Sequence, residues 1–93
     1  MGLLDGQIAI ITGAGTGIGR HTALIFAEEG ARLVLAGRRI EPLREVVRLI
    51  ISKGGSAVAK STDLEDGDAA SALGAWTLSE FGQVDILVNN AGH

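Results

Sequence analysis

The sequence predicts an α/β fold with a doubly wound parallel sheet, and three observations lead to this prediction. Short apolar runs rich in Ile, Val and Leu occur four times, and segments with helical periodicity separate them. Glycines mark most of the junctions between these segments. Strict alternation of strand and helix implies right-handed crossovers and a parallel sheet. The core must be aliphatic, because hydrophobic residues make up 46% of the chain and aromatic residues only 3%.

The four apolar runs are the predicted strands, and the first follows a turn signal at Asp5-Gly6. They cover residues 7–12, 32–36, 56–60 and 85–89. Apolar runs of this kind are typical of strands buried on both faces by helices. We expect the strand order 3-2-1-4. The fourth strand would then lie at an edge, where the apolar run 86–88 is an aggregation hazard.

Three helices are predicted between the strands. The first begins near Ile18 and ends at Gly30, the second has Pro42 in its first turn, and the third covers residues 66–81. An amphipathic helix turns the residues at helical spacing toward the core. In chain order these residues are Ile18, Thr22, Ile25, Phe26 and Glu29, then Leu43, Val46, Val47, Ile50 and Ile51, then Ala69, Leu73 and Trp76.

A glycine-rich loop at residues 12–19 joins the first strand to the first helix. Glycines let a pyrophosphate approach the peptide N–H groups, and the helix N-terminus adds free donors and the positive end of its dipole. The loop does not fit Gly-x-Gly-x-x-Gly, because Ile18 stands at the last position, nor a P-loop, because Arg20 and His21 follow Gly19. Its position between strand and helix still favours a nucleotide site over a plain turn.

Three motifs together resemble those of a known family. The first is Thr12-Gly13-x-x-x-Gly17-x-Gly19, the second is Asp63-Leu64 after the third strand, and the third is Asn89-Asn90-Ala91-Gly92 after the fourth. In this order and on these elements they resemble the classical short-chain dehydrogenases/reductases, which have a Rossmann-type fold. The resemblance extends over residues 1–93, which match the N-terminal, NAD(P)-binding portion of a family member.

The resemblance implies a role for each motif. The backbone of the loop would hold the phosphates of a dinucleotide, and the loop residues concerned are Gly13, Gly15, Thr16, Gly17, Ile18 and Gly19. Asp63 would accept a hydrogen bond from the adenine amino group, and the Leu64 backbone would contact the neighbouring ring nitrogen. Asn89, Asn90, Ala91 and Gly92 would run along the ribose toward the nicotinamide. Without the resemblance, Asp63 would be a candidate helix N-cap, and the asparagines would form an ordinary turn.

The end of the second strand distinguishes NADP from NAD. An NAD site has an acidic residue there, about 20 residues after the glycine loop, that binds the ribose hydroxyls. Gly37 stands at this place, and Arg38 and Arg39 follow it. A guanidinium suits a 2′-phosphate, so we expect NADP, with Arg38 as the first candidate for the contact and Arg39 as the second. NAD is the less favoured alternative. One observation supports it: in the family, NADP-dependent members often have a basic residue where this loop has Thr16.

The resemblance also implies an oxidoreductase that transfers hydride between NADP(H) and a small carbonyl or alcohol substrate, as a homo-oligomer. Catalysis in the family uses a tyrosine with a lysine four residues later, and this chain contains no tyrosine. We therefore assign no catalytic residue within residues 1–93 and expect this chain alone to be inactive. We expect it to be a portion of a longer parent protein.

Two other classes of function stay open. A non-catalytic nucleotide-binding module fits the missing tyrosine. An S-adenosylmethionine-dependent methyltransferase fits the spacing of Gly13, Gly15 and Gly17. Such methyltransferases usually have acidic residues just before the loop and after the second strand, where this chain has Thr12 and Gly37.

Composition and charge argue against several other classes of protein. A formal net charge of −3 does not favour a nucleic-acid partner. The chain has no cysteine, so we expect no disulfide, and no cluster of residues suggests a metal site. The N-terminus lacks the features of a signal peptide, and no apolar stretch approaches the ~18 residues of a membrane span. We therefore expect a cytoplasmic protein without a membrane partner.

Overall fold

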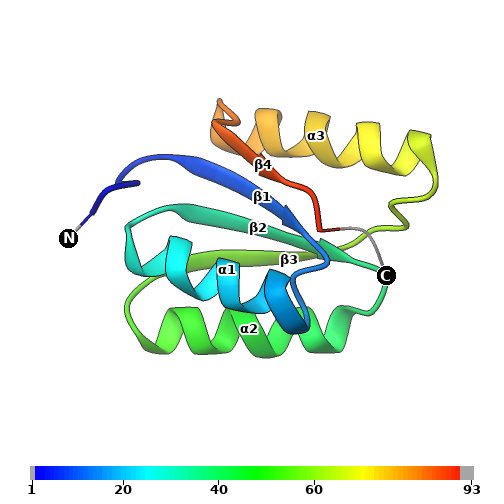
Figure 1. The fold of residues 1–93 in the computed structure, drawn as a ribbon. Coiled ribbons are helices and arrows are strands. Elements are labelled where there is room, and N and C mark those ends of the chain that lie inside the picture. Colours follow the sequence, from blue (N-terminus) through cyan, green and yellow to red (C-terminus); the bar gives the residue numbers. More distant parts are fainter. Residues whose placement is uncertain (1, 91–93) are drawn as a thin grey trace.

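The computed structural model describes residues 2–90 and confirms the predicted architecture (Figure 1). The elements are β1 (Ile8–Thr12), α1 (Gly17–Glu28), β2 (Arg32–Gly37), α2 (Ile40–Ser52), β3 (Ser56–Ser61), α3 (Gly67–Phe81) and β4 (Ile86–Val88). The strands form one parallel sheet in the order β3-β2-β1-β4. This is the order that the alternation of strands and helices predicts.

The sheet separates two apolar layers, because successive side chains of a strand point to opposite faces. Ile11 of β1 and Leu35 of β2 face α1 and α2 and are fully buried. Ile10 and Val34, one residue earlier in each strand, pack with Leu73 of α3 on the other face. Figure 1 shows the same division, with α1 and α2 on one side of the sheet and α3 on the other.

The predicted first helix is present, but its buried face differs from the one expected. Gly19 and Ala23 are buried, whereas Ile18 is 78% exposed and Ile25 is 44% exposed. A Cβ atom on Gly19 would collide with the carbonyl oxygen of Gly13, so the start of α1 lies too close to the loop for a larger side chain. Of the large apolar residues expected to face the core, Phe26 packs against it, whereas Ile18 and Ile25 do not.

The second helix follows its predicted stripe except at the end. Leu43, Val46 and Ile50 are buried, and Val47 packs against the same core. Ile51 is 57% exposed although the preceding Ile50 is buried, because successive residues of a helix lie about 100° apart around its axis. Three residues of the stripe thus supply most of the contact between α2 and the sheet.

The third helix has an N-cap that differs from the candidate considered in the sequence. The Asp66 carboxylate accepts hydrogen bonds from the N–H groups of Asp68 and Ala69, at 2.9 and 3.4 Å. Asp66 is therefore the N-cap, and the interpretation of Asp63 as a cap is wrong. At the other end, Gly82 has a φ of +79° and ends the helix in the left-handed conformation, as its position predicts.

Two aromatic residues of α3 pack against the sheet, in agreement with a packing role for Trp76. The rings of Trp76 and Phe81 meet edge to face, with 6.1 Å between their centroids. The Lys60 ammonium lies 4.3 Å from the Trp76 centroid, and the Arg32 guanidinium lies 5.0 Å from the Phe81 centroid. These cation–π contacts join α3 to β3 and β2.

The fourth strand forms one edge of the sheet and is shorter than predicted. Its three residues pair only with β1 among the described strands, and Leu87 is 64% exposed. The polar residues that flank it make other contacts. Asp85 accepts a hydrogen bond from the Ile8 N–H at 2.8 Å through its side chain, and the Asn90 N–H donates to the Thr12 hydroxyl.

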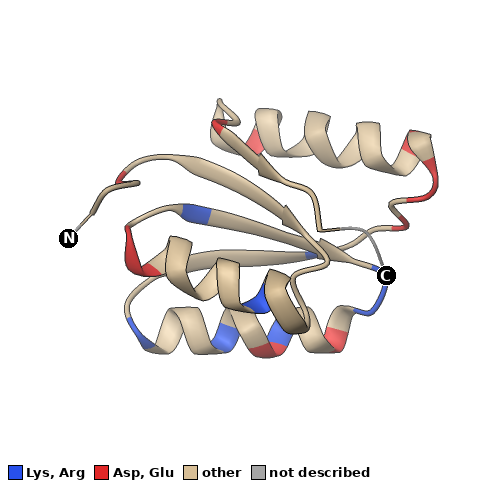
Figure 2. Cartoon of the chain, viewed as in Figure 1, with Lys and Arg blue, Asp and Glu red and all other residues tan. Residues whose placement is uncertain are grey.

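Charged residues of both signs are spread over the described chain (Figure 2). Helix α2 carries two acidic and two basic residues, whereas α3 carries only the acidic Asp68 and Glu80. Within residues 2–90, no helix is both long enough and apolar enough to cross a bilayer.

Candidate functional site

The glycine loop lies across the carboxyl ends of three neighbouring strands. The Gly13 N–H donates to the Ala36 carbonyl oxygen at 2.9 Å, which holds the loop against the end of β2. Gly13 has a φ of +61°, and a Cβ atom there would lie 2.7 Å from the carbonyl oxygen of Asn90, just after β4. Only glycine combines this left-handed backbone with so close an approach. In open α/β sheets, ligands bind outside the carboxyl ends of the strands.

The N-terminus of α1 opens directly from this loop and is left free by the protein's own side chains. Thr16 is the N-cap residue, yet its side chain makes no capping hydrogen bond, and no acidic residue lies in the first turn. The N-terminus of α3 differs, since Asp66 caps it. The first N–H groups of α1 can therefore donate to an anion, and the helix dipole favours negative charge there.

A cleft of about 590 Å³ extends from the loop across the ends of β2 and β3. Its size is within the usual range for a small-molecule site, about 300–1,000 Å³. It brings together seven of the residues predicted to bind the cofactor. These are Gly13, Gly15, Thr16, Arg38, Arg39, Asp63 and Leu64.

The other predicted residues lie beside the cleft rather than in its lining. Gly17, Ile18 and Gly19 form the first residues of α1. Asn89 and Asn90 follow β4, on the other side of the loop. Ala91 and Gly92 lie outside the residues that the structure describes.

The cleft is also lined by residues that sequence reasoning did not assign to the site. Gly37, Pro42, Leu43 and Glu65 join the lining. Pro42 and Leu43 were interpreted only as parts of a helix, and nothing in their spacing indicates that the first turn of α2 faces the loop. A Cβ atom on Gly15 would lie 2.8 Å from the Cβ of Pro42, so the loop packs against the first turn of α2 too closely for a side chain at this position.

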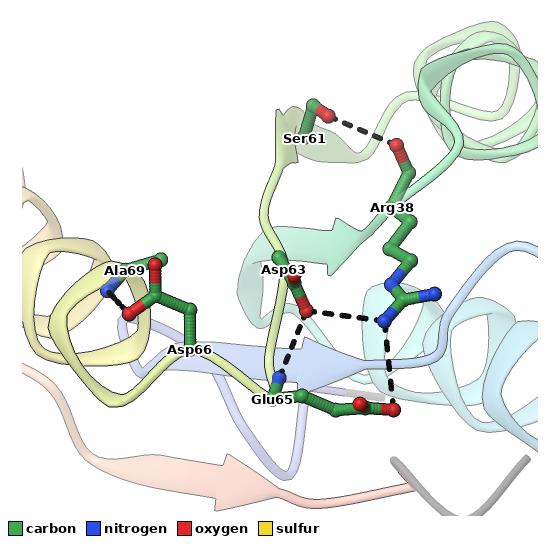
Figure 3. A network of polar contacts seen from close by, with 6 residues as sticks. All are labelled: Arg38, Ser61, Asp63, Glu65, Asp66 and Ala69. Carbon is green, nitrogen blue, oxygen red and sulfur yellow. Dashed lines mark hydrogen bonds and ion pairs between the residues drawn. The ribbon is translucent and has the colours of Figure 1, made fainter.

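Charged side chains form a network at the far end of the cleft (Figure 3). The Arg38 Nη2 lies 3.4 Å from the Asp63 Oδ1 and 3.5 Å from the Glu65 Oε2. The Ser61 hydroxyl donates to the Arg38 carbonyl oxygen at 3.0 Å, and the Thr62 N–H donates to the Gly37 carbonyl oxygen at 2.7 Å. These two bonds hold the segment after β3 against the segment after β2, so Asp63 and Arg38 face each other.

A second network surrounds Thr12, which is 4% exposed at the end of β1. Its hydroxyl accepts a hydrogen bond from the Asn90 N–H at 2.9 Å and lies 3.1 Å from the Asn89 Oδ1. The Asn90 side-chain amide is buried, and its Nδ2 has no hydrogen-bond partner among the described residues. The asparagine pair thus joins the segment after β4 to the end of β1.

The two networks and the loop define the chemistry that the site offers. Apolar walls from Pro42, Leu43 and Leu64 suit a planar ring, while loop N–H groups and two arginines suit phosphate. Among residues 2–90, no group of three or more His, Asp or Glu residues is placed to hold a metal ion. The site therefore resembles the adenosine and phosphate end of a dinucleotide site.

Comparison with known proteins agrees with this geometry. Residues 7–93 match the family model of the short chain dehydrogenases. The chain is 46% identical over 89 residues to the 7alpha-hydroxysteroid dehydrogenase of Escherichia coli K12, an alignment that covers 96% of this chain and 35% of that enzyme. The chain thus spans about a third of the length of this curated relative.

Solved structures show the same likeness. A metagenomic short-chain oxidoreductase in complex with NADP superposes with a TM-score of 0.94 at 44% identity, over 97% of this chain and 41% of that one. A 7 alpha-hydroxysteroid dehydrogenase complexed with NADH and 7-oxo glycochenodeoxycholic acid gives a TM-score of 0.92 at 46% identity, over 97% of this chain and 35% of that one. With the glycine loop, the sheet order and the family match in agreement, the chain belongs to the short chain dehydrogenase family.

Proposed function

We propose that the protein is an oxidoreductase that transfers hydride between NADP(H) and a carbonyl or alcohol substrate, with residues 1–93 as its NAD(P)-binding portion. One observation carries the proposal. The glycine loop and Arg38 line the same cleft as the Asp63-Leu64 pair, beside an uncapped helix N-terminus. These groups suit the phosphates, the ribose and the adenine ring of a dinucleotide.

Each part of the site has a role in this proposal. The loop backbone from Gly13 to Gly19 holds the pyrophosphate, with the N-terminus of α1 directed at its charge. Asp63 and Leu64 bind the adenine edge, between the apolar walls of the cleft. Asn89 and Asn90, followed by Ala91 and Gly92, lead toward the nicotinamide, which supplies or accepts the hydride when the cofactor is bound.

Preference for NADP over NAD is part of the proposal. Gly37 provides no carboxylate for the ribose hydroxyls, and Arg38 and Arg39 line the cleft next to it. Arg38 is the first candidate to bind the 2′-phosphate because its guanidinium already points across the cleft toward Asp63. The similar solved structures include one protein bound to NADP and one bound to NADH, so both cofactors belong in the test.

Hydroxysteroids are the first substrates to examine. The relatives include a 7alpha-hydroxysteroid dehydrogenase and a 3beta-hydroxysteroid dehydrogenase from Mediterraneibacter gnavus, 46% and 40% identical to this chain. Other relatives are described only as oxidoreductases, which supports the reaction class more broadly than the substrate. Family membership does not favour the methyltransferase alternative.

The test is cofactor titration followed by turnover, with the protein in its full natural length. NADPH and NADH are titrated by calorimetry, and absorbance at the nicotinamide band then follows oxidation with a panel of ketosteroids, simple ketones and aldehydes. We expect tight NADPH binding, weaker NADH binding and turnover with at least one carbonyl. Failure to bind either cofactor contradicts the proposal. Binding without any turnover favours the non-catalytic module, and binding of S-adenosylmethionine instead favours the methyltransferase.

A further inference from the structure

Arg38 is paired with two carboxylates at the far end of the cleft. Its Nη2 lies 3.4 Å from the Asp63 Oδ1 and 3.5 Å from the Glu65 Oε2 (Figure 3). The side chains of Arg38, Asp63 and Glu65 are 62%, 52% and 85% exposed, so water reaches all three. Both contacts use the same guanidinium nitrogen, so a 2′-phosphate that binds Arg38 through its other N–H groups has two carboxylates close beside it.

The position of Glu65 follows from the turn that precedes α3. The Asp63 Oδ1 accepts a hydrogen bond from the Glu65 N–H at 3.0 Å, and the Asp66 N–H donates to the Asp63 carbonyl oxygen at 3.1 Å. This tight turn, stabilised by an aspartate side chain, fixes the Glu65 backbone directly after the adenine-binding pair. The Glu65 carboxylate consequently lies on the same side of Arg38 as Asp63 (Figure 3).

The contact between Glu65 and Arg38 affects the charge that the cleft offers to a phosphate. Its lining contains two arginines, Arg38 and Arg39, and two carboxylates, Asp63 and Glu65, so the formal charge of the lining is zero. A phosphate monoester carries about −1.5 to −2 charges at pH 7. Asp63 is already proposed to bind adenine, whereas Glu65 has no such partner in the proposed site. The carboxylate of Glu65 therefore acts only to reduce the positive charge that Arg38 offers.

We propose that Glu65 is a specificity-determining residue that weakens the preference for the phosphorylated cofactor by pairing with Arg38. This inference rests on the proposed function, because it requires that Arg38 bind the 2′-phosphate. Glu65 acts through Arg38 and is thus a positioning residue. Its removal frees Arg38 for the phosphate but leaves the contacts of an unphosphorylated ribose unchanged.

The test is the ratio of the dissociation constants for NADH and NADPH in the full-length protein. Exposed ion pairs contribute little, so Glu65→Gln should tighten NADPH binding by about two- to fivefold while NADH binding changes by less than about 1.5-fold. Glu80→Gln is the matched control. It removes the same charge from the last turn of α3, about 20 Å along the helix from its start at Gly67, and should leave both constants unchanged.

A double variant tests whether Glu65 acts through Arg38. In Arg38→Ala, the additional change Glu65→Gln should alter the NADH to NADPH ratio by less than about 1.5-fold, because no guanidinium remains to be released. The same two- to fivefold change in that background would overturn the inference, since Glu65 would then act on the phosphate directly. Equal tightening of both cofactors by Glu65→Gln would overturn it as well. Failure of the unaltered protein to bind either cofactor would instead contradict the proposed function, so the two failures are distinguishable.

Discussion

The hydroxyl of Thr12 accepts a hydrogen bond from the backbone N–H of Asn90 at 2.9 Å and so joins the end of β1 to the segment after β4. The two residues are 78 positions apart in the chain. The proton of the same hydroxyl is within reach of the Asn89 Oδ1 at 3.1 Å or the Val88 carbonyl oxygen at 3.3 Å. One buried side chain therefore sets the position of the asparagine pair relative to the glycine loop.

Removal of this hydroxyl should lower the free energy of unfolding. Thr12→Val keeps the branched shape but leaves the Asn90 N–H without its acceptor, at a cost of about 1–3 kcal/mol for a buried donor. Thr12→Ser is the control, because it keeps the hydroxyl and loses one methyl group, worth about 0.8 kcal/mol. Urea denaturation of the full-length protein gives both values. A Thr12→Val variant as stable as the unaltered protein would mean that the hydrogen bond contributes nothing.

Replacement of Arg38 should weaken NADPH binding more than NADH binding. A charge-assisted contact contributes about 1.5–3 kcal/mol, which corresponds to roughly a 10- to 150-fold change in the dissociation constant. We expect Arg38→Ala to fall near the lower limit, because the guanidinium is exposed and its charge is shared with the carboxylates of Asp63 and Glu65. Arg39→Ala is the matched control and should have the smaller effect. Equal losses for NADPH and NADH in Arg38→Ala would show that Arg38 does not bind the 2′-phosphate.

An acidic residue at position 37 should shift the preference toward NADH. Gly37 is not among the glycines with positive φ, and a Cβ atom there would meet only the Leu43 methyl groups, at 3.7 and 3.8 Å. Gly37→Asp should therefore fold normally and place a carboxylate where the ribose hydroxyls are expected. We expect NADPH binding to weaken by about tenfold or more, as one repelled charge at short range implies, and NADH binding to improve.

Gly37→Asn separates charge from size in the same experiment. The amide fills the same space without repelling a phosphate, so the ratio of NADPH to NADH affinity should change much less than in Gly37→Asp. If Gly37→Asp and Gly37→Asn weaken the binding of NADPH and NADH by the same factor, charge at the end of β2 does not determine the preference between the two cofactors.

A methyl group at position 19 should disturb the glycine loop and weaken the binding of NADPH and NADH to the same extent. The added Cβ would collide with the Gly13 carbonyl oxygen, which forces α1 away from the loop. Gly19→Ala should therefore cost about 1–3 kcal/mol of stability, as overpacking usually does, and reduce NADPH and NADH affinity by a similar factor. Gly74→Ala in α3 is the control, because nothing lies within 4 Å of its added Cβ and alanine favours a helix. A Gly19→Ala variant with normal affinity and stability would contradict the close approach.

The fold was largely predictable because its determinants are local. Apolar runs, helix-ending glycines such as Gly82 and the alternation of strands and helices can all be recognised along the chain, and right-handed crossovers limit the sheet to a few orders, of which β3-β2-β1-β4 was expected and is present. The packed face of α1 was not predictable in this way. Gly19 and Ala23 are buried because the helix approaches the loop closely, and small residues give no signal in a pattern based on large apolar ones.

The candidate site was likewise predictable only in part. Gly13 and Arg38 were predicted from their places just after predicted strands, because parallel strands bring their carboxyl ends to one edge. Asp63, which lines the same cleft, was predicted only through the family resemblance. Glu65 was missed because its contact with Arg38 joins residues 27 positions apart, through a turn whose geometry depends on the Asp63 side chain. Side-chain pairs across two loops depend on tertiary structure, and no periodicity encodes them.

The last prediction concerns the 93-residue chain by itself, which should lack turnover and associate in solution. It has no tyrosine to act as the general acid or base, and Asp63 lies in the adenine part of the proposed site. Proton transfer needs heavy atoms within about 2.6–3.2 Å or one bridging water, so a carboxylate at the adenine end does not reach the nicotinamide.

The exposed edge of the sheet is the reason to expect association. Leu87 is 64% exposed on β4, which pairs only with β1 within the described part of the chain, and an unpaired apolar edge attracts other chains. Light scattering on the purified 93-residue chain should give a mass above that of a monomer, and a Leu87→Lys variant should shift it toward the monomer, because charge on an edge strand opposes pairing. An NADPH oxidation assay with ketones and aldehydes should stay at background for both. A well-folded monomer with turnover would contradict both parts of the prediction, and His21 and His93 would then be the first residues to replace.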